Sequence, residues 1–407
     1  MATAINYDLF THDVVQDPYT YFGRLREEDP VHFNELYEMW FITRYDDLVW
    51  LTRHPELFSN AVLKTDPKPP APAIEESDLG LYEFVRDFFG SFFIQYDRPE
   101  HVDMRKVVHH YFNPKAMESW RPLVVDVIHG LLDEAEEKGS MDVMHDLAVP
   151  VPLLVIAQML GMPNRDRPFL RQLSEQLLFI GRGERDRMKP ITEAIQELQE
   201  YLGPLVVERL DNPGDDLLSV LAHGEKTGVY TRDQVVANAV LLLLAGHETT
   251  INLICNGTLS FIRHPDQWNL FKQDPVKLMK PATEECLRYD SPVKTITRIA
   301  SEDVEMRGGK VLGKEERIRW VISSANRDPE KFPEPEKFEI NRYPNLHVAF
   351  GSGIHHCLGA TLARLEGQEA FRALAERFDS LHLATDNIEY QPSITFRSVK
   401  SLPVTWN

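Results

Sequence analysis

One cysteine stands directly after a glycine-rich segment and at the start of a predicted helix. Residues 350–359 read FGSGIHHCLG, with Gly351 and Gly353 six and four positions before Cys357. Glycines at this spacing allow a tight turn that other residues adopt only at a cost. The amphipathic stretch 358–378 follows, and a helix start stabilises a thiolate through free N–H groups and its dipole. Cys357 therefore suits metal binding, although a buried structural cysteine fits the same residues.

A polar segment interrupts residues 233–263, which otherwise read as one long buried helix. The part before Ala245 is apolar nearly all round, and GHETT follows at 246–250. Glycine inside a helix costs about 1 kcal/mol relative to alanine, and threonine hydroxyls bend helices. Glu248 beside Thr249 pairs an acid with an alcohol, which suits proton delivery, whereas an ordinary buried kink is the alternative. His247 should face another direction, and we expect a structural role for it.

Two further sets of charged residues are candidates for positioning or binding. Glu285 and Arg288 lie three positions apart in a helical stretch and so share one face, although most such pairs are solvated and weak. Residues 98–105, RPEHVDMR, place His101 and Arg105 close together. Taken singly, each of these is more often an ordinary surface charge.

The elements that must position these residues are mostly helices. From residue 81 to about 290, apolar residues recur three and four positions apart. Before this block, a short helix at 18–28 and strand-like runs at 30–33 and 39–43 predict a small amino-terminal sheet. Residues 64–80 are rich in proline and predict a surface loop. Short β-branched runs follow residue 295, so the order favours an α-dominated α+β fold.

Composition and charge exclude several classes of protein. Lys and Arg total 44 against 63 Asp and Glu, and the net charge of −19 argues against nucleic-acid or anionic-lipid partners. The amino terminus lacks a signal-peptide pattern, and no stretch reaches the ~18 uninterrupted apolar residues of a membrane span. Cys255, Cys286 and Cys357 have no CxxC spacing, which argues against a zinc site and a disulfide framework. We therefore expect a cytoplasmic protein without a membrane partner.

At the cysteine loop the sequence resembles the cytochrome P-450 family, whose haem segment reads FGxGxHxCxG. Every fixed position of this pattern is present, Gly351 and Gly359 included. The resemblance implies that Cys357 is the proximal ligand of the haem iron, where a thiolate pushes electron density toward bound oxygen. It also implies that Phe350 packs beside the sulfur and the haem, and that His355 hydrogen-bonds a haem propionate.

The other motifs resemble the same family in the expected order. By resemblance, Ala245 and Gly246 leave room for dioxygen, and Glu248 and Thr249 are the catalytic acid and alcohol. Glu285, Arg288 and Arg342 resemble a structural triad that holds the cysteine loop in shape. His101 and Arg105 match a PEHxxxR pattern, and with Arg298 they would join His355 as partners of the propionates.

The resemblance spans the chain from about Asp17 to the end. It implies a mainly α (α+β) cytochrome P-450 fold, a helical block around haem with small β-sheets near the N- and C-terminal parts. We expect residues 1–407 to form a single haem domain without a fused reductase, in which 61–96 is a variable substrate-roof region.

The implied function is that of a haem-thiolate monooxygenase with haem b (iron protoporphyrin IX) as cofactor. One atom of O2 would enter a small-to-medium hydrophobic substrate by hydroxylation, epoxidation or O-dealkylation. Electrons would come from a separate ferredoxin or flavodoxin with an NAD(P)H-dependent reductase. The expected donor-docking patch consists of Lys106, His109, His110, His356 and Arg364.

The substrate pocket is expected where the family usually contacts its substrates. The residues are Phe89, Phe92, Phe93, Leu178, Leu241, Leu244, Val293, Thr295, Ile296, Ile394 and Thr395. Alternative functions are a peroxide-using haem-thiolate enzyme, a non-catalytic haem-binding protein and a haem-free scaffold. The pair Glu248 and Thr249 argues against the first two, and a scaffold leaves Cys357 unexplained.

Overall fold

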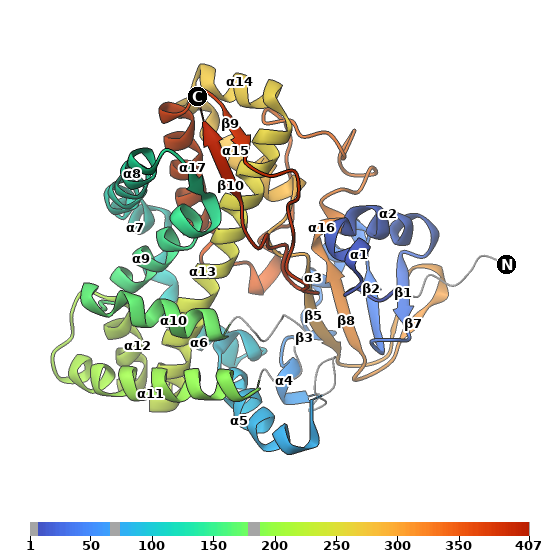
Figure 1. Cartoon of the computed structure of the whole chain (residues 1–407). Helices are drawn as coiled ribbons and strands as arrows, with labels where there is room; N and C mark the ends of the chain where they lie inside the picture. Colours follow the sequence, from blue (N-terminus) through green and yellow to red (C-terminus); the bar gives the residue numbers. More distant parts are fainter. Residues whose placement is uncertain (1–6, 66–73, 178–187, 407) are drawn as a thin grey trace.

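The longest helix, α13 (Arg232–Arg263), runs through the middle of the molecule (Figure 1). The structure is a computed structural model, which describes residues 7–65, 74–177 and 188–406. A capping box starts α13, since the Thr231 hydroxyl accepts from Gln234 N–H and the Gln234 side chain accepts from Thr231 N–H. Within the described residues, only α13 is long and apolar enough to suit a membrane span, yet 72 % of its most apolar window is buried. It is therefore the core helix that its composition predicts.

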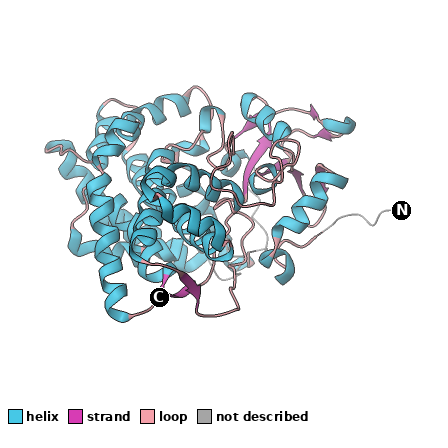
Figure 2. Ribbon diagram, turned by 90° about the horizontal axis from the view of Figure 1, so that it is seen from above, coloured by secondary structure: helices cyan, strands magenta, loops and turns pink. Residues whose placement is uncertain are grey.

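Several helices pack against α13. Figure 2 shows most of the helices as a block on one side of the molecule. Several of them begin with proline, whose fixed φ and missing N–H suit the first turn of a helix. The helices of this block are α5 (Leu79–Gly90), α6 (Glu100–His109), α7 (Pro114–Ser119), α8 (Arg121–Lys138), α9 (Pro150–Met159), α10 (Arg167–Leu177), α11 (Met188–Asp211), α12 (Leu217–Lys226), α14 (Pro265–Gln273), α15 (Pro275–Tyr289) and α17 (Ala360–Arg377).

The largest sheet joins two parts of the chain that are far apart in sequence. Its order is β1-β2-β8-β5-β3, and only β2 and β8 pair in parallel. The strands are β1 (Val31–Asn34), β2 (Met39–Ile42), β3 (Phe58–Ser59), β5 (Thr295–Ala300) and β8 (Arg317–Val321). The predicted amino-terminal strands are present as β1 and β2, but later strands belong to the same sheet. An isolated two-stranded hairpin is marginal in water, and the later strands supply its missing partners.

Smaller elements complete the fold, and the predicted mainly α class with small sheets is confirmed. The short strands are β4 (Met141–Asp142), β9 (Leu381–Leu383) and β10 (Pro403–Trp406) in one sheet and β6 (Val304–Glu305) and β7 (Val311–Leu312) in another. The remaining helices are α1 (His12–Gln16), α2 (Pro18–Glu28), α3 (Tyr45–Arg53), α4 (Val62–Thr65) and α16 (Ile322–Ala325). The predicted surface loop at 64–80 is too long, because helical structure resumes at Glu76.

Candidate active site

The cysteine loop, residues 350–359, has a shape that requires glycine. Gly351 and Gly353 have φ angles of 66° and 70°, in the left-handed region. A Cβ atom on Gly353 would lie 2.3 Å from the carbonyl oxygen of Thr52, so no larger residue fits without a backbone shift. The N–H of Cys357 donates to the carbonyl of Phe350 at 2.9 Å and closes the loop. The turn and its closing hydrogen bond therefore fix where Cys357 lies.

Cys357 is surrounded by protein atoms but is exposed to a cavity that it lines. Helix α17 begins at Ala360, two residues later than predicted. Burial raises the pKa of the Cys357 thiol, while a hydrogen bond from the N–H of Gly359 and the positive charges of Arg105 and Arg364 lower it. The Gly359 N–H and the two arginines thus stabilise a thiolate, whereas burial of the sulfur favours the neutral thiol.

One face of α13 lines the same cavity, which has a volume of about 320 Å³. The lining positions 241, 242, 245, 246, 249, 250 and 253 recur at helical spacing. The Thr249 hydroxyl donates to the carbonyl of Ala245 at 3.0 Å. Glu248 is half-buried and is not among the described residues that line the cavity. His247 is buried and contacts the Val149 carbonyl at 3.2 Å, in keeping with the structural role expected of it.

Cationic and imidazole groups meet near the cysteine loop. The rings of His101 and His355 lie 4.0 Å apart, and Arg105 and Arg298 line the cavity beside His355. Both ring nitrogens of His101 and Nε2 of His355 are buried without a hydrogen-bond partner among the described residues. Burial, together with nearby arginines, lowers the pKa of His101 to about 4 and that of His355 to about 2, so both rings are neutral at pH 7.

The tautomer of His355 is set by a neighbouring amide. The side-chain NH₂ of Asn60 donates to Nδ1 of His355 at 3.1 Å, which leaves the ring proton on Nε2. Arg298 lies with its Cζ atom 4.4 Å from the ring centroid of Trp320. The cluster therefore presents two guanidinium groups and an unused N–H donor.

Glu285, Arg288 and Arg342 lie in direct contact, as their motif implies. Arg288 donates to both carboxylate oxygens of Glu285 at 2.8 Å, and both side chains are fully buried. Arg342 Nε reaches the same carboxylate at 3.2 Å. Arg288 also donates to three backbone carbonyls between residues 326 and 337. These bonds hold the segment that leads into the cysteine loop.

Comparison with known proteins identifies the family. The sequence profile described as Cytochrome P450 matches residues 31–395. The chain belongs to the cytochrome P450 family. This P450 is 36 % identical over 399 residues to the polyketide biosynthesis cytochrome P450 PksS of Bacillus subtilis (strain 168). The alignment covers 96 % of each chain.

Two further likenesses support the assignment. The P450 is 35 % identical to 6-deoxyerythronolide B hydroxylase of Saccharopolyspora erythraea over 406 residues, 98 % of each chain. It also resembles the crystal structure of CalO2 with a TM-score of 0.90 and 31 % identity, covering 99 % of both chains. The chain therefore has the cytochrome P450 fold and is a P450 monooxygenase.

Four of the predicted substrate-pocket residues line the cavity of the P450, namely Phe93, Leu241, Val293 and Ile296. Leu178 lies outside the described residues. Six predicted residues are not among the described cavity lining, namely Phe89, Phe92, Leu244, Thr295, Ile394 and Thr395.

Packing turns these side chains elsewhere. The rings of Phe89 and Phe92 lie 4.9 Å apart and both pack on Phe88. Leu244 falls between the cavity-facing positions of α13. Thr295 and Ile296 are neighbours in β5, so they face opposite sides of the sheet, and the Thr295 hydroxyl donates to the Ile394 carbonyl.

Sequence reasoning missed Glu366, which lines the cavity from α17. Its side chain is 1 % exposed, and burial raises its pKa to about 8, partly offset by a hydrogen bond with Thr250. An acid on the apolar face of the last helix, four positions after Leu362, was the available signal. Asn60 and Trp320 were also missed, because both lie in segments without a motif.

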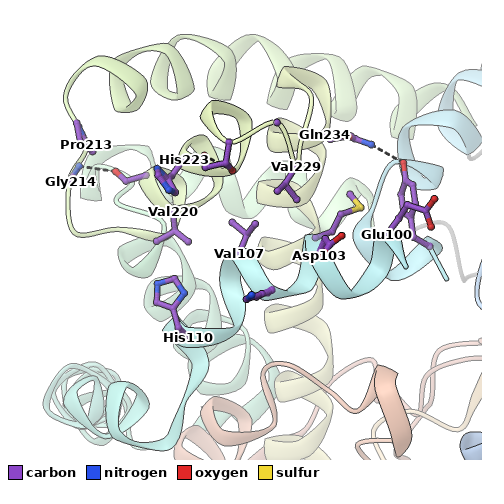
Figure 3. A pocket seen from close by; sticks show the side chains of 16 residues that line it. Glu100, Asp103, Val107, His110, Pro213, Gly214, Val220, His223, Val229 and Gln234 are labelled. Atoms are coloured by element: carbon purple, nitrogen blue, oxygen red, sulfur yellow. Dashed lines mark hydrogen bonds between the residues drawn. The ribbon is translucent and has the colours of Figure 1, made fainter. Parts of the chain in front are cut away.

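The predicted donor-docking patch is divided in the structure. Lys106 and His110 line a separate groove of about 910 Å³ between α6 and α12. Figure 3 shows His110 in this groove with His223 and Val220 of α12. Arg364 instead makes a bidentate contact with Glu284. Arg364 is thus paired with an acid, whereas Lys106, His109, His110 and His356 are exposed.

Proposed function

We propose that this P450 uses haem b, ligated by Cys357, to insert one atom of O2 into a small-to-medium hydrophobic substrate. The observation that carries the proposal is that Cys357 and the α13 residues Ala245, Gly246 and Thr249 line one cavity. A thiolate on one wall and an alcohol on another are the groups that oxygen activation requires.

The residues around this cavity fit a haem. Haem is apolar apart from two propionates, which need cationic or donor partners when buried. Arg105, Arg298 and the free N–H of His355 would hold the propionates, and His101 has two buried nitrogens without a partner among the described residues. Phe350 and the backbone of Gly351 and Gly359 line the cavity beside the sulfur.

In the proposed reaction the chain's own residues bind, orient and move protons. When bound, the haem supplies the oxygen chemistry. The Thr249 hydroxyl, held by the Ala245 carbonyl, would present a proton inside the cavity. Glu248, half-buried on the adjacent position, would pass protons from solvent toward Thr249. Glu285, Arg288 and Arg342 would keep the cysteine loop rigid.

The lining indicates the class of substrate. Phe93, Leu241, Val293 and Ile296 are apolar and would bind a hydrophobic molecule with few polar groups. One relative is named for polyketide biosynthesis and another as a hydroxylase of 6-deoxyerythronolide B. Polyketide-like compounds are therefore the first set to screen, by the spin-state shift of the Soret band that substrate binding produces.

The proposal includes separate electron-donor proteins. We treat residues 1–407 as a single haem domain that receives electrons from a ferredoxin or flavodoxin with an NAD(P)H-dependent reductase. The enzyme would act in the cytoplasm, where such donors are reduced.

The reduced protein under carbon monoxide provides the direct test. A strongly red-shifted Soret band is expected for the wild-type protein and its loss for Cys357→Ala. A Cys357→Ala protein that kept the band and oxidised substrate would refute the ligand assignment.

Isotope labelling distinguishes the monooxygenase from the peroxide-using alternative. With labelled O2 and a reduced donor, one labelled atom is expected in the product. Product that forms only from added peroxide, without label from O2, would favour the peroxide-using enzyme instead.

A further inference from the structure

A second charged network lies beside the triad of Glu285. The carboxylate of Glu284 accepts hydrogen bonds from His347 Nε2 at 3.0 Å and from Arg364 Nε and Nη2 at 2.7 and 2.9 Å. Glu284 lies on α15, Arg364 lies on α17, and His347 lies three residues before the cysteine loop. One carboxylate thus connects two helices with the entrance of the loop.

Both partners of Glu284 also contact the cysteine loop or the residue before it. The Cζ atom of Arg364 lies 4.4 Å from the ring centroid of Phe350, whose carbonyl accepts the N–H of Cys357. The N–H of Ala349 donates to Nδ1 of His347, so the Nε2 of that ring carries the proton given to Glu284. Glu284 is thus connected to Cys357 through the Arg364 guanidinium, the Phe350 ring and the hydrogen bond from the Cys357 N–H to the Phe350 carbonyl.

This network differs from an ordinary surface ion pair. Exposed pairs contribute about 0–1 kcal/mol because water screens them. Here the side chains of Glu284 and His347 are 26 % and 3 % exposed, and the contact with Arg364 is bidentate. Burial alone would raise the pKa of Glu284, but its hydrogen bonds with His347 and Arg364 hold it at about 2. The carboxylate is therefore ionised at neutral pH.

Two cations lie beside the cysteine loop in the described part of the chain. Arg364 lies against Phe350, and Arg105 donates to the carbonyl of His356, the residue before Cys357, at 2.6 Å. The negative charge of Glu284, in direct contact with Arg364, offsets part of the positive field of that arginine.

We propose that Glu284 is a positioning residue for Cys357: it holds Arg364 against Phe350 and sets how much positive charge the sulfur experiences. The inference rests on the proposed role of Cys357 as haem ligand. It assigns a function to the acid that precedes the Glu285 triad.

The test measures the reduction potential of the haem-loaded, substrate-free protein by spectroelectrochemical titration. Glu284→Gln keeps the size and an accepting oxygen but removes the negative charge, so the potential should shift to a more positive value. Arg364→Gln leaves Glu284 uncompensated and should shift the potential to a more negative value. The double variant should lie between the two.

A matched control is available on α12. Glu225 pairs with Arg232 at 2.6 Å and is 24 % exposed, close to the 26 % of Glu284. Glu225→Gln should leave the potential at the wild-type value. Because opposite shifts report charge, a loss of packing alone would not produce them.

Three outcomes would overturn the inference: equal potentials for Glu284→Gln and Glu225→Gln, shifts of the same sign for Glu284→Gln and Arg364→Gln, or an unshifted Arg364→Gln. Should Glu284→Gln fail to retain haem, the sign of the Arg364→Gln shift still decides. A wild-type protein without the red-shifted carbon monoxide band would instead refute the proposed function.

Discussion

At the scale of single residues, the alcohol on α13 is the group that we propose for proton delivery. Thr249 lines the cavity and its hydroxyl is held in place by the Ala245 carbonyl. Glu248 is adjacent to it but is not among the described residues of the lining. The proposed division is therefore that Glu248 supplies protons and Thr249 presents them.

Thr249→Ala should separate oxygen consumption from product formation. We expect product per electron to fall about a hundredfold, the low end of general acid–base contributions, while reduction of the protein continues. The measurement is product, peroxide and NAD(P)H in the same reaction. Thr192→Ala removes a helix hydroxyl that donates to the Met188 carbonyl and serves as control. Equal coupling in the two variants would contradict the assignment.

Glu366 predicts a pH effect on stability. Its folded pKa of about 8 exceeds the ordinary glutamate value of about 4.3, so the folded protein binds this proton more tightly than the unfolded chain. The stabilisation is complete below about pH 4 and is lost as the pH rises through about 8.

Glu366→Gln should therefore gain thermal stability relative to wild type as the pH is raised from about 6 to about 9. The measurement is Tm against pH. The control is Glu376→Gln, which changes a partly exposed acid of the same helix. A difference in Tm between wild type and Glu366→Gln that does not vary with pH would argue against a buried neutral carboxyl.

At the scale of elements, the cysteine loop owes its shape to two glycines with different surroundings. Both have a positive φ, but a Cβ atom on Gly351 would meet no atom within 4 Å, whereas one on Gly353 would meet the Thr52 carbonyl at 2.3 Å. The backbone of the cysteine loop at Gly353 is thus in direct contact with the backbone of α3 at Thr52.

Substituting each glycine by alanine separates these two effects. Gly351→Ala should cost about 1–2 kcal/mol for the left-handed backbone alone. Gly353→Ala should cost about 3 kcal/mol or more and lower haem retention, because the loop must move away from Thr52. Thermal unfolding and the haem content after purification are the measurements. Similar losses of stability and haem in both variants would mean that the contact with Thr52 contributes little to the stability of the loop.

Elements with a strong local signal could be predicted from the sequence. The long run before Ala245 and the breaks at His264-Pro265 gave α13 within one residue, and the glycines marked the cysteine loop. The sequence did not indicate which side chains of a strand face the cavity. Thr295 and Ile296 lie side by side in sequence, yet the pleat of β5 sends only Ile296 to the cavity.

At the scale of the whole molecule, contacts between distant segments hold the fold together. Arg397 donates to the carbonyls of Val15 and Gln16 at 2.7 and 2.9 Å and lies 3.4 Å from Asp290. It therefore connects the first helix, the end of α15 and the carboxyl-terminal loop. No local pattern marked this arginine, because its partners come from more than a hundred residues away. The same reason hid the pairing of β2 with β8.

Arg397→Met should be strongly destabilising. It leaves Asp290 and two backbone carbonyls without this cation in the interior, for which about 3–5 kcal/mol is typical. Lys400→Met removes an exposed cation paired with Glu389 and should change stability by less than about 0.5 kcal/mol. Urea unfolding of both variants gives the comparison. Nearly equal midpoints would show that Arg397 is dispensable.

The interleaved order of the large sheet also bears on how the protein is made. β1, β2 and β3 are synthesised early, but β8 and β5, which complete their sheet, end only at residues 321 and 300. On the ribosome β1 and β2 must wait for roughly 280 further residues before β8 is complete, which at about 5–20 residues per second takes many seconds. During that interval a pair of strand edges is open to the wrong partner. Slow growth at low temperature, with chaperones in excess, should consequently raise the yield of soluble chain.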